Sequence, residues 1–169
     1  DRFKCRVCKV TIDTGLSCPN RDGTKGVGGC DYCVSSVLLP KALASGTDVK
    51  SQLDEGIAYV RGRHKAEKFI AYFQVNTSTH APLEELEKLF RAALIPEVAC
   101  VAVSTRPDSL GDGVIALLCE IKKERPLWVE LGLQSANDAT LERVNRRHTA
   151  AEFKGAVLRA AAAGIDICA

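Results

Sequence analysis

The sequence predicts an α/β fold: a partial (β/α)6 TIM-like barrel with parallel strands, truncated in the fifth strand. Segments with strand periodicity alternate with segments of helical periodicity, and short connections join them, as in parallel βαβ units. Along the expected strands one face is apolar, whereas the other becomes more polar toward the carboxyl ends. A doubly wound sheet is covered by helices on both faces and would be apolar on both. The observed pattern favours a barrel with helices outside and a ligand-binding lumen inside.

Each element rests on a local pattern, taken in chain order. Alternation of residue types and a content rich in branched and aromatic side chains predict four strands, over residues 6–13, 69–75, 98–104 and 127–133. Apolar residues at helical spacing predict helices over residues 49–60, from Pro82 to Leu94, over 112–124, and near 138–145 and 151–163. Pro82 suits the first turn of its helix, where a missing N–H costs nothing. A fifth strand begins at Ile165 and is cut short at Ala169.

The fourth predicted strand shows the difference between the two faces most clearly. Side chains alternate across a strand, so residues two apart share a face. The apolar face holds Leu127, Val129, Leu131 and Leu133, whereas the opposite face holds Trp128, Glu130, Gly132 and Gln134. We therefore expect Glu130 and Gln134 to face the lumen.

Length and composition exclude several classes of protein. The 169 residues are 46% hydrophobic and 26% charged, which indicates one ordered domain. The net charge is +2, without a long basic tract that would indicate a nucleic-acid binder. Apolar runs are too short for a membrane span, and no signal peptide is evident, so we expect a cytoplasmic protein. Since methionine is absent, we expect residues 1–169 to be a fragment of a longer protein, incomplete at both termini.

Three of the eight cysteines lie in a glycine-rich loop after the first strand. Cys18, Cys30 and Cys33 follow the pattern C-x11-C-x2-C, and four glycines lie between the first two of these cysteines. Glycines allow the backbone to approach a bulky inorganic group closely and to direct N–H groups at it. Iron–sulfur clusters normally have four cysteine ligands, so three indicate a [4Fe–4S] cluster with one open iron.

These residues resemble the radical S-adenosylmethionine (SAM) enzymes, in particular their YhcC-like, Elongator Elp3-related branch. The resemblance covers nearly the whole chain and has five matching stretches: KVTIDTGLSCPNRDGTKGVGGCDYC at residues 9–33, IAYFQ at 70–74, TRPDSL at 105–110, WVELGLQS at 128–135 and RVNRRH at 143–148. It implies that residues 1–169 are a radical SAM core domain. It also implies a [4Fe–4S] cluster and SAM as cofactors.

The resemblance implies roles for single residues. Cys18, Cys30 and Cys33 would ligate the cluster. The residues that would contact SAM are Tyr32 at the adenine, Gln134, Arg146, and Glu130 at the amino group or ribose. A related enzyme has a glutamate at the end of its third strand, where this chain has Ser104-Thr105-Arg106.

The implied reaction is the reductive cleavage of SAM to a 5′-deoxyadenosyl radical, which abstracts hydrogen from an unknown substrate. That substrate would be a small molecule or RNA, although the small net charge weighs against RNA binding by this segment. The electron donor would be a flavodoxin or ferredoxin, and no membrane partner is expected.

Two other functions compete with this hypothesis. Cys5, Cys8, Cys30 and Cys33 would form a zinc-ribbon-type binding module, although this leaves Cys18 and the glycines without a role. An iron–sulfur electron carrier would make no use of Gln134 and Arg146.

The remaining candidates are expected to be structural or are left open. Gln74 and Asn76 either face substrate or fill the lumen. The other expectations are surface positions for His64, His80 and His148, and core positions for Cys100, Cys119 and Trp128.

Overall fold

A computed structural model of the chain describes residues 3–34 and 48–169. Its five strands form one sheet in the order β1-β2-β3-β4-β5, and all neighbouring strands are parallel. The strands are β1 (Val7–Ile12), β2 (Lys68–Phe73), β3 (Val98–Thr105), β4 (Leu127–Leu131) and β5 (Asp166–Cys168). The helices are α2 (Val49–His64), α3 (Leu83–Ala92), η1 (a 3-10 turn, Pro107–Ser109), α4 (Asp112–Glu124), α5 (Asp138–Arg143) and α6 (Ala150–Ala162).

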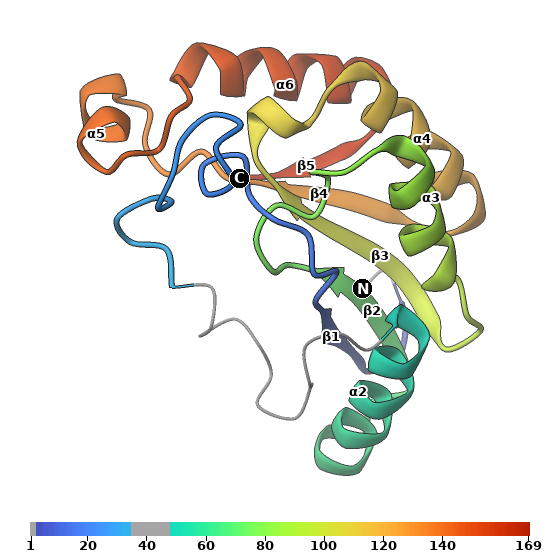
Figure 1. The fold of residues 1–169 in the computed structure, drawn as a ribbon. Coiled ribbons are helices and arrows are strands. Elements are labelled where there is room, and N and C mark those ends of the chain that lie inside the picture. Colours follow the sequence, from blue (N-terminus) through green and yellow to red (C-terminus); the bar gives the residue numbers. More distant parts are fainter. Residues whose placement is uncertain (1–2, 35–47) are drawn as a thin grey trace.

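The helices cover one side of the curved sheet. Figure 1 shows α2, α3, α4 and α6 following the outer side of the arc of strands. Sequential strands lie next to each other, as right-handed βαβ connections require when each helix packs on the same side. This arrangement leaves the inner side of the arc as the lumen, and the connections after each strand meet at one end of it.

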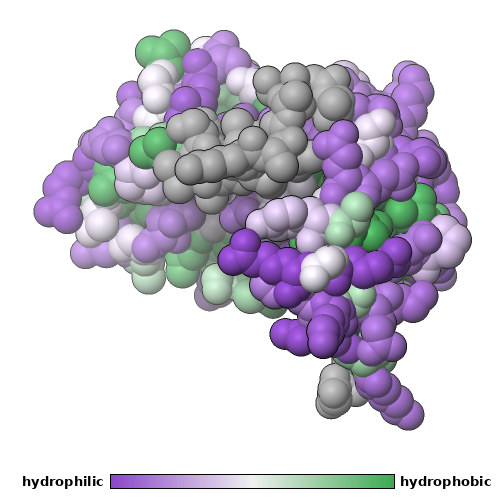
Figure 2. Space-filling view, turned by 90° about the horizontal axis from the view of Figure 1, so that it is seen from below, coloured by the Kyte–Doolittle hydropathy of each residue, from purple (hydrophilic) through white to green (hydrophobic). Residues whose placement is uncertain are grey.

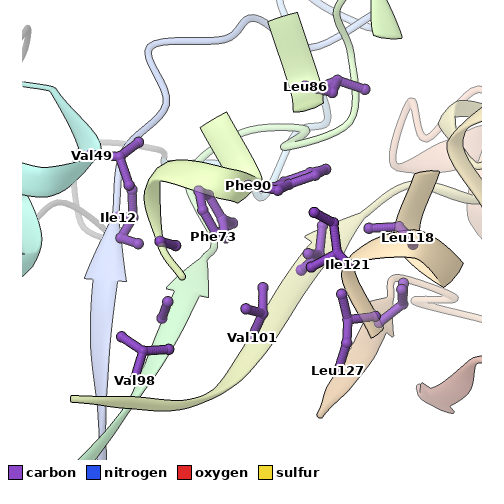
Figure 3. Packing of buried hydrophobic residues seen from close by; sticks show 14 of the residues in the cluster. Ile12, Val49, Phe73, Leu86, Phe90, Val98, Val101, Leu118, Ile121 and Leu127 are labelled. Carbon is purple, nitrogen blue, oxygen red and sulfur yellow. The ribbon is translucent and has the colours of Figure 1, made fainter. Parts of the chain in front are cut away.

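The hydrophobic core lies between the sheet and these outer helices. Figure 3 shows strand residues such as Phe73 and Val101 directed toward Phe90 of α3 and Leu118 of α4. The rings of Phe73 and Phe90 pack edge to face, with centroids 5.0 Å apart. Each of these four side chains has 0% exposure, so the centre of the core is sequestered from water.

The inner face of the sheet is more polar. Register places Ser104 beside Glu130, and Thr11 beside Tyr72, on neighbouring strands. In β1 the buried residues are Val10 and Ile12, which alternate with residues that are partly or fully exposed. The prediction of an α/β fold with parallel strands forming part of a TIM-like barrel is confirmed.

Several boundaries differ from those predicted. The second and fourth strands end two residues early, at Phe73 and Leu131, because the polar segments that follow leave the sheet to form loops. The first helix continues to His64, four residues beyond the prediction, and ends at Lys65 in the left-handed conformation. In α4 the buried positions are Ile115, Leu118 and Ile121, whereas Val114 and Leu117 are partly buried.

Side-chain caps fix the starts of α2 and α6. Asp48 accepts hydrogen bonds from the first-turn amides of α2. Thr149 and Glu152 form a reciprocal capping box at the start of α6. Because the cap fixes where α6 begins, it also fixes the connection from α5, which contributes to the site described below.

No helix within the described residues is long and apolar enough to cross a membrane. In Figure 2, which views the molecule from below, the surface outside the grey atoms is largely hydrophilic, with hydrophobic residues in separate areas.

Candidate functional site

The cysteine loop folds on itself after β1. Two backbone amides, of Arg21 and Asp22, donate to the carbonyl of Cys18 at 2.7 and 3.1 Å. The amide of Cys33 donates to the carbonyl of Cys30 at 2.9 Å, which closes the C-x-x-C turn. Positive φ angles at Gly28 (84°) and Gly29 (89°) explain the glycines at that point, because other residues are strained in this conformation.

The loop is anchored to the connection between α5 and α6. The side-chain amide of Asn20, which is fully buried, donates to the carbonyl of Asn145 at 2.6 Å. The side-chain amide of Asn145 in turn donates to the carbonyl of Gly29 at 2.8 Å. Figure 1 shows the loop, in blue, beside α5. These contacts join residues that are far apart in the sequence and hold the loop at the carboxyl ends of the strands.

The three loop thiols line one cavity of about 170 Å³. Three of the four residues predicted to contact SAM, Tyr32, Gln134 and Arg146, line the same cavity. The other lining residues are Arg21, Gly29, Gln74, Asn76, Thr77, Ser104, Thr105, Arg106 and Gly132. The structure therefore brings together the ends of three strands, β2, β3 and β4, and the cysteine loop around one space.

Positive charge surrounds the thiol of Cys30. Nη1 of Arg146 lies 3.7 Å from Cys30 Sγ, and Nδ2 of Asn20 lies 3.4 Å from it. Burial alone would raise the pKa of Cys30. The hydrogen bonds from Arg146 and Asn20 and the charge of Arg146 outweigh burial, so that the pKa lies below its ordinary value. The site thus favours the thiolate, the form that ligates metal.

Arg146 is held by two further contacts. Its Nε donates to Nε2 of His148 at 2.9 Å, and its Nη2 donates to the carbonyl of Gly132 at 3.1 Å. His148 is buried, with 5% exposure, so the prediction that it lies on the surface is wrong. Its ring fills the space behind Arg146, and burial, followed by the charge of Arg146, lowers its pKa. The histidine is therefore neutral and can accept from the guanidinium.

Arg106 is a second buried cation, which sequence reasoning did not single out. It has 2% exposure and lies after β3, beside η1. Its Nε and Nη2 both donate to the carboxylate of Asp108 at 2.9 Å, and its Nη1 lies 4.0 Å from Cys30 Sγ. The only indication in the sequence was that a related enzyme has a glutamate at the end of its third strand, where this chain has Ser104-Thr105-Arg106.

Gln134 and Arg146 approach each other over Gly132. A Cβ atom at Gly132 would lie 2.7 Å from Nε2 of Gln134 and 2.8 Å from Nη2 of Arg146. Gln134 itself has a φ of 66°, an unusual left-handed conformation for a residue that is not glycine. A larger residue than glycine would therefore displace the ends of these two side chains from the point where they converge.

Three more candidate residues line the cavity: Tyr32, Gln74 and Asn76. Tyr32 is 47% exposed, and partial burial raises its pKa to about 12, so that the phenol stays protonated. Gln74 and Asn76 line the cavity, and Nδ2 of Asn76 donates to the carbonyl of Leu16 at 3.0 Å. The amide of Asn76 therefore also supports the segment that leads into the cysteine loop.

Glu130 lies outside this cavity lining, in a cluster of its own. Its carboxylate accepts from Lys9 at 2.6 Å, from the hydroxyl of Tyr72 at 2.5 Å and from the indole of Trp128 at 3.2 Å. Burial opposes ionisation, but these hydrogen bonds lower the pKa of Glu130 below its ordinary value. Trp128 thus belongs to this polar cluster and is only partly buried, whereas Cys100 is in the core as expected and Cys119 is partly buried.

The alternative zinc site is wrong. Cys8 lies in β1 and Cys5 precedes it, whereas Cys30 and Cys33 lie in the loop beyond the opposite end of that strand. Within the described part of the chain, no three His, Cys, Asp or Glu side chains are grouped to hold a single metal ion. The thiolates of a polynuclear cluster bind different irons, so they do not need to converge on one point.

Comparison with known proteins gives a family match over most of the chain. Residues 18–169 match the radical SAM superfamily. The chain is 37% identical, over 99% of its length, both to an uncharacterised protein of Bacillus subtilis, YtqA, and to the protein YhcC of Escherichia coli. It covers 52% of the former and 53% of the latter, so it spans about half the length of these relatives.

Solved structures share the fold. The chain matches the archaeal Elp3 of Methanocaldococcus infernus with a TM-score of 0.59 and 16% identity, over 90% of this chain and 34% of that one. It matches the cobalamin-dependent radical SAM enzyme OxsB with the same TM-score and identity, over 93% of this chain and 23% of that one. Membership of the superfamily implies SAM and a [4Fe–4S] cluster, together with a substrate and a reductant. The chain is thus similar to YhcC and YtqA, and it belongs to the radical SAM superfamily of enzymes.

Proposed function

We propose that this chain is the core domain of a radical SAM enzyme, in which Cys18, Cys30 and Cys33 ligate a [4Fe–4S] cluster and SAM binds beside it. One observation carries the proposal: the three thiols and two of the predicted SAM contacts, Gln134 and Arg146, line the same cavity.

The residues at the site fit both groups. Three thiols, in surroundings that favour the thiolate of Cys30, suit a cluster that keeps one iron free for another ligand. The absence of a side chain at Gly132 leaves room where Gln134 and Arg146 converge, at the carboxyl end of β4. Ligands of α/β barrels bind at this end of the strands.

When bound, the cluster and SAM supply the reductive cleavage that generates a 5′-deoxyadenosyl radical able to abstract hydrogen. The protein orients the cofactors and keeps water away from them. Arg146 has a fixed direction because His148 and Gly132 hold its guanidinium, so it suits the carboxylate of SAM. The ring of Tyr32 would lie against the adenine, and Gln134 would donate to or accept from the nucleoside.

Glu130 is also proposed to contact the amino group or ribose of SAM, although it lies outside the cavity lining. Its three present donors satisfy the carboxylate inside the protein, and Lys9, one of them, has a side chain that is 41% exposed. A contact with SAM would therefore require either a shared carboxylate oxygen or a rearrangement of the lysine.

The substrate, a small molecule or RNA, would approach from the lumen, where Gln74 and Ser104 line the cavity. Reduction by a flavodoxin or ferredoxin and a cytoplasmic location are further parts of this proposal.

The test is SAM cleavage by protein reconstituted anaerobically with iron and sulfide and reduced with dithionite. We expect 5′-deoxyadenosine to form with the reconstituted protein and not with the same protein before reconstitution. The variant Cys33→Ala should lose this activity, whereas Cys5→Ala, which alters a thiol before β1, should retain it. Formation of no 5′-deoxyadenosine above the unreconstituted control would contradict the proposal.

A further inference from the structure

A buried ion pair lies directly behind the cysteine loop. The side chains of Arg106 and Asp108 are only 3% and 4% exposed, and two parallel hydrogen bonds of 2.9 Å join them. Lys25, in the cysteine loop, contacts the same carboxylate at 3.0 Å. Because buried charges are costly unless paired, this arrangement fixes the position of the Arg106 guanidinium firmly.

The orientation of Arg106 leaves one nitrogen for the cysteine loop. Its Nη2 also donates to the carbonyl of Arg146 at 2.9 Å, so Nε and Nη2 are both occupied by protein acceptors. Nη1 lies 4.0 Å from Cys30 Sγ. Because Nε and Nη2 are bonded to protein acceptors and the side chain is only 3% exposed, the guanidinium of Arg106 has a fixed position beside Cys30.

Cys30 is therefore flanked by two guanidinium groups, of Arg146 and Arg106, and only Arg106 is paired with a carboxylate. Arg146 contacts it at 3.7 Å, lines the cavity and is proposed to bind SAM. Arg106 lines the same cavity and is held by Asp108, whose negative charge partly offsets its own. The reduction potentials of iron–sulfur clusters depend on net charge and on hydrogen bonds to the sulfurs. A fixed cation favours the reduced cluster, which carries one more negative charge.

We propose that Arg106, held by Asp108, is a positioning residue that raises the reduction potential of the cluster through the sulfur of Cys30. This inference rests on the proposed function, since it requires the cluster. The step concerned is the transfer of one electron from an external reductant to the oxidised cluster, in which no covalent bond is formed or broken. The positive charge of Arg106 would thus make the cluster easier to reduce before SAM is cleaved.

The test is a redox titration of the reconstituted protein without SAM, followed by electron paramagnetic resonance of the reduced cluster. In Arg106→Gln we expect the equilibrium constant for reduction to fall roughly tenfold, a shift of ~59 mV to more negative potential for a one-electron couple. Arg106→Lys keeps the charge but loses the paired hydrogen bonds, so its shift should be smaller. Arg91→Gln, which removes an exposed arginine paired with Glu87 and Glu124 on the outer helices, should leave the potential unchanged.

A second variant separates charge from disruption of the fold. Asp108→Asn removes the negative charge that offsets Arg106 but keeps one side-chain oxygen that can accept from the guanidinium, which also stays bonded to the carbonyl of Arg146. We therefore expect the potential to shift in the opposite direction, to more positive values. Opposite shifts in Arg106→Gln and Asp108→Asn would support the inference. An unchanged potential in Arg106→Gln, or equal negative shifts in both variants, would overturn it. A wild-type protein that takes up no cluster would instead contradict the proposed function itself.

Discussion

Replacing Gly132 with alanine tests whether the convergence of Gln134 and Arg146 forms the SAM site. The added Cβ would lie 2.7 Å from Nε2 of Gln134 and 2.8 Å from Nη2 of Arg146, closer than such atoms normally approach. Gly132 is not among the residues with positive φ, so alanine can adopt its backbone conformation. Both clashing atoms end flexible side chains. We therefore expect these side chains to move apart while β4 stays in place.

The expected loss follows from the contacts of Arg146. Its Nη2 donates to the carbonyl of Gly132 at 3.1 Å, and displacement would break this hydrogen bond and misdirect the guanidinium. A hydrogen bond that involves a charged group contributes about 1.5–3 kcal/mol. If this stabilisation is lost from the complex, the affinity for SAM falls roughly 10- to 150-fold.

The assay is calorimetric titration of SAM into the reconstituted Gly132→Ala protein. A matched control is Gly113→Ala in α4, whose Cβ would lie 2.9 Å from Cδ1 of Leu83, away from the cavity. The control should bind SAM as the wild type does. If Gly132→Ala also binds SAM with unchanged affinity, these two side chains do not form the SAM site as argued.

Three further predictions concern the cluster, the core and the buried histidine. Cys18→Ala should prevent iron uptake in reconstitution whereas Cys5→Ala should not, as measured by iron analysis; equal loss in both would contradict the assignment of ligands. Leu118→Ala, at a position with 0% exposure, should lower the free energy of unfolding by about 2–5 kcal/mol in a denaturant titration, and a loss below ~1 kcal/mol would argue against the packing described. His148 has a lowered pKa when folded, so the unfolded chain binds a proton more readily as the pH falls below the ordinary histidine value of about 6.5. The stability contributed by neutral His148 should be complete above that pH and be lost progressively as the pH falls below it. His148→Gln should reduce this dependence, and an identical pH profile in the variant would count against it.

Much of the fold could be predicted because its signals are local. The alternation in the fourth strand separated the apolar residues that pack on the outer helices from the polar face of the lumen. Short connections between elements of alternating type then restricted the topology to parallel units. The predicted strand ends were less accurate. Polar and apolar residues continue to alternate after Phe73 and Leu131, although these later residues have already left the sheet.

The cysteine ligands could be proposed because they lie close together in one glycine-rich loop. The surroundings of these cysteines could not be predicted, because they come from contacts over long sequence distances. His148 was expected on the surface, since nothing in its neighbours indicates that the ring packs behind Arg146. Arg106 and Asp108 are two residues apart, but their burial against Cys30 depends on the 3-10 turn and on the fold of the loop.

Glu130 illustrates the converse difficulty. Its position on the lumen face was expected from the alternation, but its partners, Lys9 and Tyr72, come from β1 and β2. The alternation indicates that the carboxylate lies on the polar face. Hydrogen bonds to side chains of neighbouring strands determine that it belongs to the cluster with Lys9 and Tyr72 and not to the lining of the cysteine cavity.

The most direct test of the central claim is Mössbauer spectroscopy of the protein reconstituted with iron-57, recorded before and after SAM is added. If three thiolates hold a [4Fe–4S] cluster and leave one iron open, the spectrum should be that of such a cluster, and the signal of a single iron should change when SAM is added. A spectrum of isolated mononuclear iron, or a cluster whose irons all remain unchanged by SAM, would contradict the account.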